Sequence, residues 1–206
     1  MPEAKVKEFI VDTPTLYYGD IELSNPDTWA ELLKGKELGL SKDGIKFSCK
    51  PNVRQIEYDG RMERQVQGMD RITKWDISAE GEIVQFRNEL LPISLIKKGT
   101  TESTKFDLYT PSNKIEDTDY KMLVIVGKVH NSDLPIIIVV ENTYNGEGFE
   151  FEGKDNDEST ATFTMNAHYK QDSDTAPCKI FVKKKLSEAT SLVGKATVGK
   201  ARVGQN

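Results

Sequence analysis

The segment ATFTMNAHYK, residues 161–170, alternates apolar and polar side chains from end to end. Its apolar positions are Ala161, Phe163, Met165, Ala167 and Tyr169, and its polar positions are Thr162, Thr164, Asn166, His168 and Lys170. Because successive side chains of a strand point to opposite faces, this period predicts a strand with one face on a core and the other in water. A solvated sheet face is the simplest interpretation of the polar side, and His168 on it is typical of a surface histidine.

Strand patterns of the same kind occur along most of the chain. They predict strands at 44–50, 75–86, 105–109, 121–129, 134–140 and 147–152. The segment 134–140 is rich in Ile and Val with little alternation, which is typical of a strand covered on both faces. An acidic turn at 153–159 leads into the strand at 161–170. The chain is therefore predicted to be mainly β.

Two short helices are expected between the strands. The first begins with Asn25 as N-cap and Pro26 at the first helical position, and it ends at Gly35. The second is predicted over 89–97, where leucines and isoleucines form a broad apolar face and Asn88 can provide the cap. Pro92 falls late in its first turn, where a missing amide proton does little damage.

Length and charge limit the function classes. A chain of 206 residues fits one domain, or one domain with a sizeable appendage. A formal net charge of −5 argues against a dedicated nucleic-acid binder, because such proteins gain most of their affinity by neutralising phosphates. We expect neither membrane insertion nor secretion, since no segment approaches about 20 apolar residues and the start MPEAKVKEF has no apolar signal core.

Catalytic and metal-binding patterns are not recognisable in the sequence, so we expect no enzymatic activity and no cofactor. Cys49, Cys178, His130 and His168 lack the close pairs of structural zinc sites, and both cysteines fit buried, reduced thiols. The acidic run at 154–158 lacks the spacing of a calcium loop and is better interpreted as a hairpin tip.

Two further segments depart from the strand patterns. The stretch RQIEYDGRMERQVQGMDRITKWDI, residues 54–77, alternates at both ends but becomes a charged arm in its middle, and a surface loop is its simplest interpretation. The segment 186–206 is basic, repeats Val-Gly at Val193, Val198 and Val203, and has too little apolar mass to pack alone. A neighbouring subunit is the simplest surface that could hold it.

Two stretches resemble the major tail tube protein of long, non-contractile-tailed bacteriophages (siphophages). LGLSKDGIKF, residues 38–47, is similar to the segment that leads into the first long strand of that family. STATFTMNAHYKQDSDTAPCKIF, residues 159–181, is similar to its C-terminal hairpin. The resemblance covers roughly residues 38–182 and rests on soft patterns.

The resemblance implies a β-sandwich with one or two flanking helices, and six copies per ring that together close a large inner β-barrel. The function it implies is structural: self-assembly into stacked hexameric rings that form the hollow tail tube, house the tape measure protein and conduct DNA during ejection. The implied partners are further copies of the chain, the tape measure protein, the tail terminator and distal tail proteins, and DNA in transient passage. The implied location is the virion, after assembly in the bacterial host cytoplasm.

The resemblance also divides the chain into an N-terminal segment (1–37), a tail-tube domain (38–185) with a projecting arm (59–73), and the basic tail (186–206). The arm would pack on the neighbouring ring through Arg61, Met62, Glu63, Arg64, Val66, Met69, Asp70 and Arg71. The lumen would be lined by Glu150, Glu152, Thr162, Thr164 and Asn166. Lys46, Lys50 and Lys170 weaken this assignment, and the sequence does not decide which face of the sheet points into the lumen. The tail, with Val193, Val198 and Val203, would cross a subunit boundary.

Two alternatives remain. The same fold could form the tube of a phage-derived bacteriocin or injection machine. A monomeric β-sandwich that binds carbohydrate, with Trp75 or Tyr169 as a stacking platform, is less favoured because aromatic residues make up only 8% of the chain.

Overall fold

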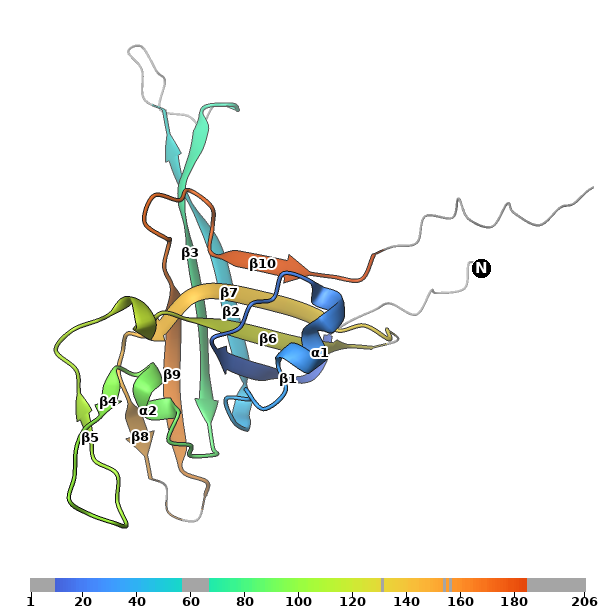
Figure 1. The fold of residues 1–206 in the computed structure, drawn as a ribbon. Coiled ribbons are helices and arrows are strands. Elements are labelled where there is room, and N and C mark those ends of the chain that lie inside the picture. Colours follow the sequence, from blue (N-terminus) through green and yellow to red (C-terminus); the bar gives the residue numbers. More distant parts are fainter. Residues whose placement is uncertain (1–9, 57–66, 131, 154, 156, 185–206) are drawn as a thin grey trace, which may run out of the picture.

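A computed structural model describes residues 10–56, 67–130, 132–153, 155 and 157–184. The protein is mainly β (Figure 1). Its strands are β1 (Ile10–Gly19), β2 (Ser41–Gln55), β3 (Asp70–Ile83), β4 (Ile96–Lys98), β5 (Tyr109–Pro111), β6 (Lys121–Val129), β7 (Ile136–Asn145), β8 (Glu150–Glu152), β9 (Thr160–Ala167) and β10 (Cys178–Phe181). Its helices are η1 (Pro26–Thr28), α1 (Trp29–Leu32), α2 (Leu90–Ile93) and η2 (Asp117–Asp119).

One large antiparallel sheet contains all strands except β4 and β5, which pair with each other. Its order is β1-β6-β7-β9-β3-β2, with β10 added to β7 and β8 added to β9. β1, β6, β7 and β10 form a first layer that runs across β2, β3, β8 and β9, which form a second layer (Figure 1). The layers are joined where the end of β7 pairs with the end of β9.

The main core lies between the two layers. Leu123, Ile125 and Val140 of the first layer belong to the same buried cluster as Phe163 and Met165 of the second. A second cluster covers the opposite face of β6 and β7, where Val124, Val126, Ile137 and Val139 meet Ile21, Leu23 and Leu33. β7 is therefore covered on both faces, as its Ile- and Val-rich sequence predicted.

The corner of β7 is made by two asparagines. Asn142 adopts a positive φ of 52°, a conformation that asparagine tolerates better than most residues, and its carbonyl oxygen accepts the N–H of His168 at 3.1 Å. Asn145 is 1% exposed, and its Oδ1 accepts the N–H of Thr164 at 3.2 Å. The Asn145 side chain thus replaces a strand partner for β9 where β7 ends.

The first helix lies where the sequence predicted it. Asn25 caps it by accepting the N–H of Asp27 at 3.0 Å, and Gly35 follows it with a φ of +77°. The helix begins as a 3₁₀ turn and buries Leu33 in the second cluster. It therefore covers the outer face of the first layer (Figure 1).

The predictions of a helix over 89–97 and of a strand over 105–109 were wrong in extent. α2 spans only Leu90–Ile93, because Leu95 turns to a φ of +61° and the chain continues into β4. The N-cap of α2 is Glu89 instead of Asn88. Only Tyr109 of the second segment lies in a strand, since Ser103 Oγ accepts the N–H groups of residues 105 and 106 in a local turn.

Gly81 provides a test of the core. An added Cβ would lie 2.9 Å from Ile45 Cδ1 and 3.1 Å from the Phe163 ring. We expect Gly81→Ala to lower the free energy of unfolding by about 1–3 kcal/mol through overpacking, measured by urea unfolding. Gly99→Ala is the control, because its Cβ would meet Leu108 at an ordinary 3.5 Å. Equal stability of the two variants would contradict this packing.

Candidate functional site

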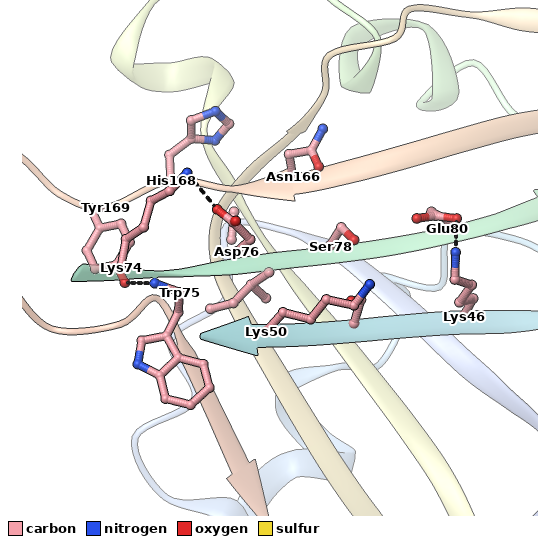
Figure 2. A pocket seen from close by; sticks show the side chains of 13 residues that line it. Lys46, Lys50, Lys74, Trp75, Asp76, Ser78, Glu80, Asn166, His168 and Tyr169 are labelled. Atoms are coloured by element: carbon pink, nitrogen blue, oxygen red, sulfur yellow. Dashed lines mark hydrogen bonds and ion pairs between the residues drawn. The ribbon is translucent and has the colours of Figure 1, made fainter. Parts of the chain in front are cut away.

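The outer face of the second layer is a continuous polar surface. Because residues directly opposite in antiparallel strands share a face, the register places polar side chains in rows across the layer. One row is Ser48, Ser78 and Asn166; the next is Lys46, Glu80 and Thr164; a third is Glu82, Thr162 and Glu150. A shallow hollow on this face extends along β2 and β3 to the residues that follow β9 (Figure 2). We call this surface the polar face.

Opposite charges are paired on the polar face. Lys46 Nζ lies 2.8 Å from Glu80 Oε2, and Lys74 Nζ lies 2.8 Å from Asp76 Oδ1 (Figure 2). The hydrogen bond from Lys74 lowers the pKa of Asp76, and Asn52 Nδ2 also donates to this carboxylate at 2.8 Å. Such exposed pairs add little stability, but they reduce the field that the face presents to a passing charge.

The predicted lumen residues come together on this surface. Thr162, Thr164 and Asn166 share the polar face, with Thr164 Oγ1 donating to Glu147 Oε2 at 3.0 Å. Glu150 and Glu152 lie beside them on β8, opposite Thr162 and Thr160. The sequence interpretation missed Ser48, Ser78 and Glu80, although their alternation with apolar neighbours was a usable signal.

The three lysines that weakened the lumen hypothesis occupy different places. Lys46 and Lys50 line the hollow of the polar face, and Lys46 is paired with Glu80 there. Lys170 lines a different hollow, beside Lys121 and Glu141. Only two of the three lysines therefore bear on the charge of the polar face.

Beyond the end of β9, β2 and β3 continue as a two-stranded ribbon, which we define as residues 51–56 and 69–75. Its ladder runs from Pro51 opposite Trp75 to Gln55 opposite Asp70, and it projects from the rest of the sheet (Figure 1). Met69 accepts the N–H of Ile56 at 2.8 Å, and Arg71 lies opposite Arg54. The other predicted arm residues, Arg61, Met62, Glu63, Arg64 and Val66, lie outside the described residues.

The ribbon exposes apolar side chains. Val53 lies opposite Ile72, and these two side chains are 53% and 51% exposed, while Ile56 is 50% exposed. An isolated two-stranded ribbon is only marginally stable in water, and the facing Arg54 and Arg71 oppose its pairing. Val53 and Ile56 were missed by the sequence interpretation because the predicted arm began at residue 59.

Strand edges are open on both sides of the second layer. In the part of the chain that the structure describes, β2 is 15 residues long and pairs only with β3, and β8 pairs only with β9. Such an edge presents unpaired backbone N–H and C=O groups that can pair with another strand. The second layer is thus a four-stranded unit, β8-β9-β3-β2, with a long free edge along β2 and a free edge of three residues along β8, because β7 pairs with the end of β9.

Trp75 and Tyr169, the predicted carbohydrate platform, are both half-buried. The backbone N–H of Trp75 donates to Tyr169 Oη at 2.8 Å (Figure 2). The Trp75 side chain packs against the main core. His168 stacks on Tyr144 with ring centroids 4.8 Å apart. These contacts account for all three rings as structural groups.

The predicted tail contacts, Val193, Val198 and Val203, lie outside the described residues.

The described residues contain no helix with the length and apolar character needed to cross a membrane. No protein-family model matches this chain, and no curated protein matches it.

The Lys74–Asp76 pair can be tested by titration. Lys74→Ala removes the main cause of the lowered pKa of Asp76, so we expect that pKa to rise toward the ordinary aspartate range. Carboxyl carbon NMR over the acidic pH range measures it. Lys46→Ala, which breaks the neighbouring pair with Glu80, is the control and should leave the pKa of Asp76 unchanged. An Asp76 pKa that is the same in Lys74→Ala as in the wild type would show that the pair does not form in solution.

Proposed function

We propose that this chain is a structural subunit of a hollow tube, the tail tube of a long-tailed bacteriophage, and that it acts by self-assembly into stacked rings. The observation that carries the proposal is the second layer: four strands with an uncovered polar face and an open edge on each side. The resemblance of residues 38–47 and 159–181 to the major tail tube family supports the same function.

Ring closure follows from the two edges. The β2 edge of one copy would pair with the β8 edge of the next, which satisfies backbone groups that a single copy leaves open. Six copies with four strands each would close a barrel of 24 strands. Strands about 4.8 Å apart and tilted near 40° give such a barrel a clear width of about 40 Å. A DNA duplex about 20 Å wide passes through it.

The polar face would then line the lumen. Its serines, threonines and asparagine offer no net charge to phosphate, and Lys46 is already paired with Glu80. Phosphate contacts by free lysines and arginines are the main source of non-specific DNA affinity. The pairing of Lys46 and Lys74 with carboxylates therefore favours sliding of DNA, while Lys50 on the same face opposes it. The same lumen would house the tape measure protein during assembly.

The ribbon would connect successive rings. It extends past β9 and exposes Val53, Ile56 and Ile72, which would be buried against the neighbouring ring. Burial of about half of each of three aliphatic side chains contributes on the order of a few kcal/mol per subunit. Mixed charges nearby, including Asp70 and Arg71, suit a polar rim that forms only against a complementary surface.

Negative-stain electron microscopy of the purified protein tests the proposal. We expect rings or tubes with a central hole in at least one sample of a series that runs from low to high ionic strength. Monodisperse monomers in light scattering under all salt conditions would refute self-assembly.

Ring stacking has a separate test. We expect Ile72→Asp, alone or with Val53→Asp, to give rings that do not stack, because a charge in the apolar contact resists burial. Ile115→Asp is the matched control, since Ile115 is similarly exposed at 47% and lies outside the ribbon. Deletion of residues 60–71 should have the same effect as Ile72→Asp. Tubes of unchanged length from both altered ribbons would refute the stacking role.

A further inference from the structure

The two free edges of the second layer carry opposite charges. On the polar face, the β2 edge presents Lys42, Lys46 and Lys50. The β8 edge presents Glu150 and Glu152 on the same face, opposite threonines of β9. A basic edge and an acidic edge on one molecule are complementary to each other, so the surface that fits each edge is a second copy of this chain.

The strand directions allow the two edges to meet. β8 is antiparallel to β9, β9 to β3, and β3 to β2, so β2 and β8 run in opposite directions. When the β8 edge of a second copy lies beside β2, the new pair is therefore antiparallel and continues the alternation of the layer.

One charge on each edge has no partner within a single copy. Lys42 and Lys46 are each held by carboxylates of their own chain. The exposed side chains of Lys50 and Glu150 form no hydrogen bond or ion pair with any other residue that the structure describes. Lys50 extends over the hollow of the polar face (Figure 2).

The geometry of a ring fixes how far the two edges are shifted. Strands of a barrel lie about 4.8 Å apart and tilt near 40° to its axis, so four strands add a shift of about 16 Å, or roughly five residues, along the strand. Within one copy, a row across the layer runs through Glu150, Thr162, Glu82 and Lys42. Because β2 begins at Ser41, only a shift toward higher residue numbers keeps the neighbour's Glu150 on β2.

This shift brings Glu150 of the neighbour to Lys50. Side chains alternate between faces, so a contact on the polar face needs an even shift, which is four or six residues. Counted from Glu82 along β3, these shifts lead to the partners of Ser48 and of Lys50 on β2. Glu150 of the neighbour therefore lies diagonal to Lys50 or directly opposite it, and long side chains bridge either separation.

We propose that an ion pair between Lys50 of one copy and Glu150 of the next sets the register of the ring interface and selects head-to-tail assembly. The proposal rests on the tube function proposed above. Two copies joined through their β2 edges would place lysines against lysines, and two β8 edges would place glutamates against glutamates. Only the head-to-tail contact joins opposite charges, and such contacts can close into a ring. The same ion pair would neutralise Lys50 in the lumen, where a free lysine would hold DNA.

The other side of this contact is apolar. Phe151 lies opposite Ala161, on the core-facing side of β8, and is 55% exposed. In the two registers it would meet Phe47 or Cys49 of the neighbouring β2, which already pack against the main core. Ring closure would therefore bury Phe151 as an extension of that core, and this burial supplies affinity while the ion pair supplies specificity.

Carbodiimide cross-linking of the assembled wild-type chain tests the contact without any substitution. The reagent joins an amine directly to a carboxylate, and the linked peptides are identified by mass spectrometry. Within one copy β9 and β3 separate β8 from β2 by about 14 Å, so a link between Lys50 and Glu150 must join two copies. We expect this link in rings assembled from a mixture of ¹⁴N- and ¹⁵N-labelled protein, with one label on each linked peptide. Rings that yield other links but never this one would overturn the proposal.

Charge exchange provides the second test. At low ionic strength we expect Lys50→Glu and Glu150→Lys each to raise the protein concentration needed for rings by about tenfold or more in sedimentation velocity, because like charges then face each other. An equimolar mixture of the two variants should form rings again, since each β2 edge then meets the other variant's β8 edge. Lys105→Glu and Glu102→Lys are the matched controls, because these exposed residues lie outside the second layer. Both should assemble like the wild type.

The outcomes separate the ion pair from the tube function. If the wild type forms rings and both single variants form them equally well, the ion pair is refuted and the tube function stands. A mixture of the two variants that stays unassembled refutes the ion pair in the same way. A wild type that forms no rings under any condition refutes the tube function and the interface with it.

Discussion

The fold depends on β7 serving two layers at once. Over most of its length β7 pairs with β6 and β10, and its last residues pair with β9 instead. A strand can change partners only where its backbone bends, and Asn142 makes this bend with its positive φ. The carbonyl oxygen of Asn142 accepts the N–H of His168 at the bend. Asn145 then satisfies the Thr164 N–H that would otherwise lose its partner. The two asparagines turn one continuous sheet into two layers with a core between them.

This arrangement makes the layers unequal. The first layer is covered on both faces, by the main core on one side and by Ile21, Leu23 and Leu33 on the other. The second layer is covered on one face only, so its other face must be compatible with water. Cross-strand rows such as Ser48, Ser78 and Asn166 meet that requirement. The same requirement makes the second layer the natural candidate for a channel wall.

Two features of the second layer remain incomplete in a single copy: the long free edge of β2 and the exposed Val53–Ile72 pair. Both would be satisfied by other copies of the chain in the proposed tube. Ring closure would use the edge of β2, and ring stacking would use the part of β2 that continues into the ribbon.

Local patterns in the sequence determined the strand at 121–129, the double coverage of β7 and the cap at Asn25, because period and capping depend on neighbouring residues alone. They also located β9, although the predicted strand ran over 161–170 and the observed one ends at Ala167. Only the tertiary structure decided which strands pair, since register is set between distant segments. That is why Glu80 beside Lys46 and Val53 opposite Ile72 could not be predicted. The short α2 and the shifted β5 have the same origin, because pairing of β4 with β5 outweighed the helical pattern at 89–97.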